Sequence, residues 1–340
     1  MSSAAAQLAP VGVYLRSCLA LFEKALALPD VTDIYVNRPG EVWVETLGGS
    51  IERFDDPSIS EMMLTRLARQ LAALTHQGVS REHPLLAATL PDGSRIQVVA
   101  PPATRGPLAL AIRRQVAASL TLQDYEANES FSETRTSPAG SSNDQLLGAL
   151  IRERKFADAL SLAVRSRKNI IISGGTSTGK TTFLNALLRE VPHDERLILI
   201  EDTPELIAEH DNCVGLVSVR GELGEARVTT NDLVSASLRM RPDRIILGEL
   251  RGPEALSFLR AVASGHPGSM TTIHADSPET AIEQLVMLVL LGGTSLSRAD
   301  VRAYVEQSVD IFVQLSRERG RRRVEALVWR GHAIAAACGQ

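Results

Sequence analysis

A glycine-rich segment that ends in lysine and threonine is the part of the sequence best suited to chemistry. Residues 174–181 read GGTSTGKT and fit the Walker A pattern G-x-x-x-x-G-K-[ST]. The glycines let the backbone curl so that its N–H groups face an anion. Lys180 can place a positive charge beside terminal phosphates, and the Thr181 hydroxyl can hold Mg²⁺. The predicted nucleotide-binding residues are Gly174, Gly175, Thr176, Ser177, Thr178, Gly179, Lys180, Thr181 and Thr182.

The flanks of this segment support the same interpretation. An apolar, β-branched run at 169–173 precedes it, and a helix-like run at 182–188 follows it. A strand, a glycine loop and a helix in this order form the context in which the pattern binds phosphate. The helix also directs its positive N-terminal end toward the anion. An ordinary Gly-rich turn would not need loop, flanks and lysine to agree.

Two further segments end an apolar strand with carboxylates. The first, residues 197–205, delivers Glu201 and Asp202 together, and either could orient or deprotonate an attacking water. The second, residues 244–249, ends in Glu249, an acid of the kind that lies near Mg²⁺ in phosphate-loop enzymes. We therefore predict that hydrolysis, and not only nucleotide binding, is possible here.

Two histidines, His266 and His274, flank the strand expected at 270–273. A lone histidine is more often structural than catalytic, and no Cys or His cluster accompanies the pair, so metal ligation by these histidines is not predicted. His274 stands at the strand end near the same cleft, where it could sense or bond the γ-phosphate.

The surrounding sequence predicts two domains. Helices and hairpins up to residue 118 indicate a compact α+β domain, and residues 119–148, rich in Ser, Thr, Pro and Gly over much of their length, read as a linker. Residues 149–340 alternate strands with helices, which predicts a parallel sheet with a nucleotide at its strand ends. Strands are expected at 170–173, 197–200, 217–219, 245–247, 270–273 and 311–315, and helices at 146–164, 180–190, 229–239, 253–264, 278–291 and 298–307.

Composition narrows the class of protein. The 340 residues are 44% hydrophobic and 22% charged, with a net charge of −4, so no global basic field indicates direct nucleic-acid binding. Cys18, Cys213 and Cys338 are scattered and predict neither a disulfide framework nor a zinc site. The N-terminus lacks a basic signal region, and the seven-residue apolar run 285–291 is too short for a membrane span. We expect a cytoplasmic protein.

Four motifs in this order resemble the secretion-ATPase superfamily. They are the phosphate loop, the acidic segment LIEDTPEL, the segment RMRPDRIILGELRG and the segment ASGHPGSMTTIHA. Three N-terminal segments, at 36–41, 93–99 and 120–125, are similar to the traffic ATPases of type IV secretion and conjugation. The resemblance implies an α/β fold, with a RecA-like P-loop ATPase domain after a smaller α+β domain.

The resemblance also implies a function and roles for individual residues. It implies an ATP-hydrolysing homohexamer with ATP and Mg²⁺ held between the two domains, near a neighbouring subunit. Its expected partners are inner-membrane components and the coupling ATPase of a type IV apparatus, so the chain would be peripheral to the inner membrane. By motif match Glu201 acts on water, Glu249 lies on the Mg²⁺ side, His274 is the histidine-box residue, and Arg95 and Arg113 reach the γ-phosphate.

The sequence departs from this pattern at two places. Gly175 stands where relatives carry a larger, often acidic residue. The residues after Arg113 lack the usual proline-containing turn, so Arg105 or Arg114 could replace Arg113.

Three alternatives stay open from the sequence alone. A pilus or type II secretion motor is the nearest one, although type II secretion ATPases carry a tetracysteine site that this chain lacks. A RecA-like nucleic-acid motor would favour a basic, aromatic surface, whereas only 4% of the residues are aromatic. The third alternative is an assembly factor that binds ATP as a switch and hardly hydrolyses it.

Overall fold

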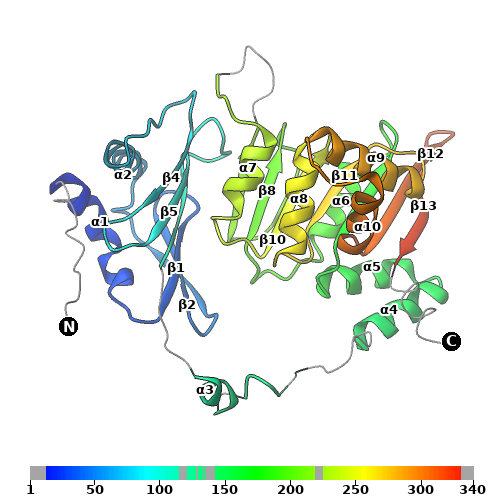
Figure 1. The fold of residues 1–340 in the computed structure, drawn as a ribbon, viewed down its shortest axis with the longest axis horizontal. Helices are drawn as coiled ribbons and strands as arrows, with labels where there is room; N and C mark the ends of the chain where they lie inside the picture. The colour runs from blue at the N-terminus through cyan, green and yellow to red at the C-terminus, as the bar shows by residue number, and fades with distance from the viewer. Residues whose placement is uncertain are drawn as a thin grey trace.

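The computed structural model places the chain in two β-sheet bodies side by side (Figure 1). It describes residues 13–114, 121–127, 129–132, 134, 142–218 and 225–330. Part of the predicted linker and the last ten residues, including Cys338, therefore lie outside the described residues. Within these ranges every helix is too short or too polar to cross a lipid bilayer.

The first body is an antiparallel six-stranded sheet with the order β3-β2-β1-β6-β5-β4. Two amphipathic helices bury their apolar stripes against one face, as the leucines of α2 at 64, 67 and 71 illustrate. Its elements are α1 (Val13–Leu26), β1 (Val31–Val36), β2 (Glu41–Thr46), β3 (Ile51–Asp55), α2 (Glu61–Leu74), β4 (Leu85–Thr89), β5 (Arg95–Val99) and β6 (Ala109–Arg113).

The second body is a seven-stranded sheet with the order β13-β12-β7-β11-β10-β8-β9. Six strands run parallel and only β13 is antiparallel, so the predicted parallel sheet is confirmed. The strands are β7 (Ile170–Gly174), β8 (Leu197–Glu201), β9 (Cys213–Val217), β10 (Arg244–Leu250), β11 (Met270–Ile273), β12 (Ile311–Glu318) and β13 (Arg321–Trp329). The helices are α4 (Ser142–Arg152), α5 (Phe156–Arg165), α6 (Lys180–Leu188), α7 (Thr230–Ser237), α8 (Glu254–Ala263), α9 (Pro278–Leu291) and α10 (Arg298–Ser308).

Some element bounds differ from the sequence-based expectation. The single helix expected over 146–164 is two helices, because the chain breaks after α4 and Arg154 adopts a left-handed φ of 59°. The strand expected at 217–219 lies earlier, as β9. The short α3 (Leu122–Ala127) belongs to the connecting segment, which leads to α4 (Figure 1).

The two bodies share a boundary along β9. The loop between β5 and β6 forms a β-bridge from Thr104 to Leu216, and Arg105 N–H donates to the Gly215 carbonyl over 2.8 Å. Tyr35, Val99 and Ala103 of the first body belong to the same buried apolar cluster as strands of the second. The N-terminal sheet is therefore attached to the edge of the second sheet, whereas β7 lies in its middle.

Candidate functional site

A cleft of about 610 Å³ opens at the carboxyl ends of β7, β8, β10 and β11. These strands are parallel, so the residues that follow them meet at one edge of the sheet. The cleft brings together the phosphate-loop residues from 176 onward, both acidic strand ends and the predicted histidine. Its lining residues are Thr176, Ser177, Thr178, Gly179, Lys180, Thr181, Thr182, Glu201, Asp202, Thr203, Glu205, Gly248, Glu249, Arg251, Thr272, His274 and Arg322.

The phosphate loop turns sharply from β7 into α6. A Cβ at Gly174 would lie 2.6 Å from Thr178 Oγ1 and 2.8 Å from the Leu315 carbonyl oxygen, so only glycine fits. Gly179 has a left-handed φ of 92° and directly precedes α6, where glycine carries no steric penalty. A Cβ on Gly175, by contrast, would meet no atom within 4 Å. The departure at Gly175 is therefore not required by packing.

Lys180 is the cation at the floor of the cleft. Its Nζ donates to the carbonyl oxygens of Gly174 over 2.9 Å and Gly175 over 3.2 Å, and it lies 3.3 Å from His274 Nδ1. Burial lowers the pKa of Lys180, an effect that the Glu249 carboxylate opposes. A buried ammonium beside curled backbone N–H groups is suited to binding a polyphosphate, because the negative charge of the anion would offset the cost of burying the ammonium.

Glu249 faces Lys180 across the cleft and is held by two side chains. It forms an ion pair with Arg251, and its Oε1 lies 2.7 Å from His274 Nε2. His274 thus connects Glu249 to Lys180 through its two ring nitrogens. His266 lies elsewhere, with Nδ1 3.1 Å from the Ala261 carbonyl oxygen, which fits a structural role.

Glu201 is the most buried carboxylate in the cleft, with a side chain that is only 3% exposed. Its Oε1 accepts hydrogen bonds from the backbone N–H groups of Glu205 (2.8 Å) and Leu206 (2.7 Å), while Oε2 pairs with Arg105. The neighbouring Asp202 accepts from Ser218 Oγ over 2.7 Å and lies 3.4 Å from Arg251 Nη1. Two backbone N–H groups fix the Glu201 carboxylate, whereas these two contacts of Asp202 are with side chains. Glu201 therefore has the more defined position, which a general base requires.

The oxygen atoms beside the phosphate loop suit a hard divalent cation. Among the described residues no group of three or more His, Cys, Asp or Glu side chains is arranged to hold a metal. A cation here would accordingly need hydroxyl, water and phosphate oxygens, which Mg²⁺ prefers. The Thr181 hydroxyl at the start of α6 and the Glu249 carboxylate supply such oxygens.

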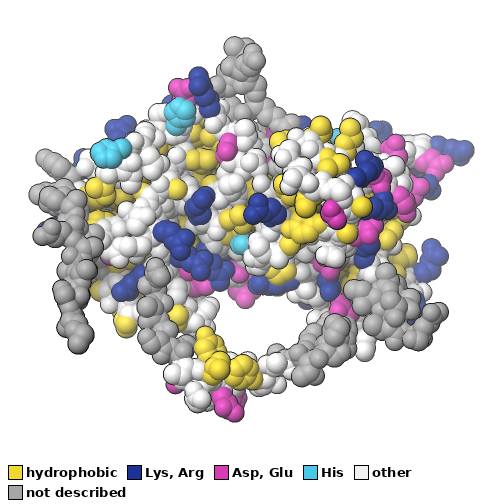
Figure 2. Space-filling view, viewed as in Figure 1, with side chains coloured by type: hydrophobic (Ala, Val, Ile, Leu, Met, Phe, Trp, Pro, Cys, Tyr) yellow, Lys and Arg dark blue, Asp and Glu magenta, His cyan; other side chains and the backbone are white. Residues whose placement is uncertain are grey.

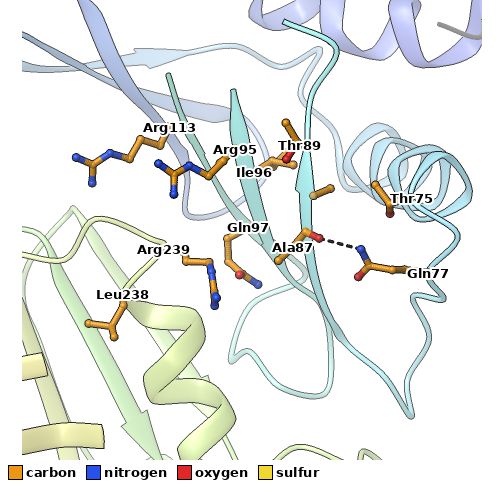
Figure 3. Close-up of a pocket in the computed structure, with 11 residues that line it drawn as sticks. Thr75, Gln77, Ala87, Thr89, Arg95, Ile96, Gln97, Arg113, Leu238 and Arg239 are labelled. Atoms are coloured by element: carbon orange, nitrogen blue, oxygen red, sulfur yellow. Dashed lines mark hydrogen bonds between the residues drawn. The ribbon is translucent and has the colours of Figure 1, made fainter. Parts of the chain in front are cut away.

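Arg95 and Arg113 do not line this cleft. They face a second cavity of about 500 Å³ between the N-terminal sheet and the end of α7. Figure 3 shows their side chains extending from neighbouring strands, with Arg239 on the opposite wall. The expectation that they form the other wall of the phosphate-loop cleft is thus not met within one chain. The reason is topological, because the N-terminal sheet packs at β9, and β11, β10 and β8 separate β9 from β7.

The two alternative arginines also lie apart from the phosphate loop. Arg114 donates to the Leu28 carbonyl over 2.7 Å in the N-terminal body. Arg105 reaches Glu201 from the side of β9, and no sequence pattern predicts this pairing. Arg322 of β13, also not predicted, lies against Gly179 and lines the cleft. Its only sequence signal is the arginine-rich run at 317–323.

Comparison with known proteins gives a consistent result. Residues 19–324 match the family described as type II/IV secretion system protein. The chain is 36% identical to the type IV secretion system protein VirB11 of Bartonella henselae over 312 residues, 87% of each chain. It is 38% identical to the PtlH protein of Bordetella pertussis over 90% of this chain and 92% of that protein.

A solved structure agrees with these relatives. The crystal structure of the VirB11 ATPase from the Brucella suis type IV secretion system, in complex with sulphate, superposes with a TM-score of 0.88. Its sequence is 34% identical, and the match covers 94% of this chain and all of that one.

Proposed function

Because the chain belongs to the family of type II/IV secretion system proteins, we propose that residues 174–182 bind ATP and that the cleft beside them hydrolyses it. The chain is an ATPase with a RecA-like fold and a component of a type IV secretion apparatus. Its similarity to VirB11 and PtlH proteins over most of its length favours this function over a pilus or type II motor and over a nucleic-acid motor.

The convergence of three side chains, Glu201, Glu249 and His274, on the phosphate-loop residues Lys180 and Thr181 carries this proposal. Lys180 neutralises the terminal phosphates, and Thr181 with Glu249 holds Mg²⁺, which supplies charge neutralisation when bound. Glu201 accepts a proton from the attacking water, because it is the carboxylate with the most fixed position. His274 connects Lys180 with Glu249 and so responds to the occupant of the phosphate site.

We further propose that Arg95 and Arg113 act on the nucleotide of a neighbouring copy in a homohexameric ring. The two arginines lie directly opposite each other on β5 and β6, and like charges in that position repel. Arg113 also lies opposite Asp33 of β1 and attracts that carboxylate, whereas the Arg95 guanidinium forms no hydrogen bond or ion pair within the described ranges. Such a pair is suited to an anion that arrives from outside the chain, such as a γ-phosphate.

The same proposal assigns the parts of the chain to a motor. Residues 1–118 and 149–340 would act as two bodies joined by residues 119–148. Loss of the γ-phosphate would then release one body from the other and turn hydrolysis into motion. The partners would be inner-membrane components and the coupling ATPase of the apparatus, which would place the chain at the cytoplasmic side of the inner membrane.

Lys180→Ala tests the phosphate site. We expect this variant to lose ATP turnover while it keeps the wild-type melting temperature, because the Lys180 ammonium bonds to carbonyls of the loop and to His274 at the open cleft. Lys155→Ala is the matched control, since Lys155 is an exposed lysine that pairs with Glu153 outside the cleft. Wild-type turnover in Lys180→Ala would refute the assignment of the cleft.

A mixing experiment tests the arginines. A chain with Arg95→Ala and Arg113→Ala and a chain with Lys180→Ala should each be inactive alone. If arginines act on a neighbour, the mixture should regain turnover, because the second chain supplies arginines to the intact cleft of the first. A mixture as inactive as its components would contradict the proposal, provided that both chains assemble, which their mass in solution with ATP establishes.

A further inference from the structure

The loop between β5 and β6 of the N-terminal sheet contacts Glu201 of the cleft through Arg105. Its backbone is fixed directly before Arg105, because Thr104 bridges to Leu216 and Val217 N–H donates to the Ala103 carbonyl over 2.9 Å. Arg105 itself donates from its backbone N–H to Gly215. The loop therefore pairs with the free edge of β9 and holds the Arg105 side chain in a defined place.

The Arg105 side chain follows a path that the sequence of β9 keeps open. A Cβ at Gly215 would overlap the aliphatic part of Arg105, so only glycine leaves this path free. At its end Nη1 donates to the Leu206 carbonyl over 3.0 Å, and Nη2 pairs with Glu201 Oε2. The guanidinium thus closes a ring of contacts around Glu201, whose other oxygen accepts the Glu205 and Leu206 N–H groups.

Glu201 needs such a partner to act as a base. A carboxylate that is only 3% exposed has lost most of its contact with water, and a paired cation with good geometry compensates for that loss. Arg105 is the cation in contact with it, because Lys180 points to the loop carbonyls and Arg251 pairs with Glu249. The other charged groups that line this cleft are Asp202, Glu205, His274 and Arg322.

We infer that Arg105 is a positioning residue that holds the Glu201 carboxylate in place and aimed at the attacking water. The inference rests on the proposed role of Glu201. Because Arg105 belongs to a loop of the N-terminal sheet, movement of that sheet displaces the guanidinium and removes its contact with the Glu201 carboxylate. The N-terminal body therefore controls hydrolysis through Glu201, separately from any contact of Arg95 or Arg113 with phosphate.

The test compares four single variants of the full chain by steady-state ATP turnover. Arg105→Ala should lower kcat by about 10- to 100-fold, a part of what a positioned base contributes, while KM stays within about threefold. Arg105→Lys should recover part of the loss, because it keeps a cation at the same place. Arg241→Ala is the matched control, since Arg241 bridges the two bodies through Glu45 over 2.7 Å without touching Glu201.

The fourth variant, Glu201→Gln, separates failure of this inference from failure of the proposed function. If Glu201→Gln hydrolyses ATP normally, the base assignment itself is wrong. If Glu201→Gln is inactive but Arg105→Ala has wild-type or higher kcat, the positioning role is refuted. An equal loss of kcat in Arg241→Ala would also overturn it, because the effect would then come from the loosened boundary.

Gly215→Ala provides a second line of evidence, because it leaves Arg105 itself unsubstituted. Its new methyl group would displace the Arg105 side chain, so kcat should fall as in Arg105→Ala. Adding Gly215→Ala to Arg105→Ala should lower kcat no further, since the displaced side chain is already absent. A full further loss in the double variant would show that Gly215 acts independently and would contradict the mechanism.

Discussion

Replacing Gly174 and Gly175 by alanine, one at a time, should have opposite consequences although the two glycines are neighbours. At Gly174 the added Cβ would lie 2.6 Å from Thr178 Oγ1 and 2.8 Å from the backbone oxygen of Leu315. Real Cβ atoms do not approach this closely, and a strand oxygen in mid-sheet cannot move aside. At Gly175 the same methyl group would meet open space, and φ lies outside the left-handed region.

The magnitude follows from the cost of overpacking. Such insertions cost about 1–3 kcal/mol, and every 1.4 kcal/mol is tenfold in affinity, so Gly174→Ala should weaken nucleotide binding by about 5- to 150-fold. Gly175→Ala should change the Kd by less than about twofold and raise the free energy of unfolding by about 0.4–1 kcal/mol, because alanine restricts the unfolded chain.

Equilibrium titration with a fluorescent ADP analogue measures both Kd values, and thermal unfolding shows whether either variant is misfolded. Equal loss of binding in the two variants would refute the packing argument. So would normal binding and normal stability in Gly174→Ala, since the close approach to Leu315 would then have no consequence.

Three further predictions concern other parts of the molecule. Arg244 is fully buried and pairs with Glu195 through Nε and Nη2 over 2.6 and 2.8 Å. Arg244→Met leaves the buried Glu195 without this partner, so it should lower the free energy of unfolding by about 3–5 kcal/mol in urea titrations. An unchanged urea midpoint would show that the pair is dispensable. Burial raises the pKa of Cys213 to about 11, which leaves the thiol neutral at pH 8. In a chain whose other two cysteines are serine, alkylation of Cys213 at pH 8 should be on the order of 200-fold slower than alkylation of a thiol with pKa 8.5. The alkylation rate should rise as the pH approaches 11. A rate typical of a free thiol at pH 8 would contradict the burial of Cys213. Thr181→Ala should raise the Mg²⁺ concentration for half-maximal turnover by at least about tenfold, and a chelator should stop wild-type turnover; an unchanged Mg²⁺ titration would remove Thr181 from the proposed cation site.

Much of the cleft could be predicted because its parts are local in sequence and ordered by a simple rule. Each functional segment is a strand followed by its polar residue, and parallel strands bring such residues to one edge. Glu201, Glu249 and His274 meet the phosphate loop for this reason. The edge strand β13 was missed because its arginine-rich start, 321–323, is exposed and carries no apolar alternation.

What the sequence did not predict depends on contacts between distant segments. The position of Arg95 and Arg113 follows from which edge of the second sheet the N-terminal sheet packs against, and no local pattern encodes that choice. The contact of Arg105 with Glu201 joins residues that are far apart in the chain. Gly215 is its only trace in the sequence, and the reason for that glycine becomes visible only once the arginine lies over it.

The most direct test of the central claim is phosphate release by the full chain carrying Glu201→Gln, measured together with its Kd for ATP. The proposed cleft predicts a Kd close to that of the wild type, because Lys180 and the loop are intact, and a turnover about 10²- to 10⁴-fold lower, because the positioned base is lost. Hydrolysis at the wild-type rate would contradict the account and shift the role of base to Asp202 or Glu249.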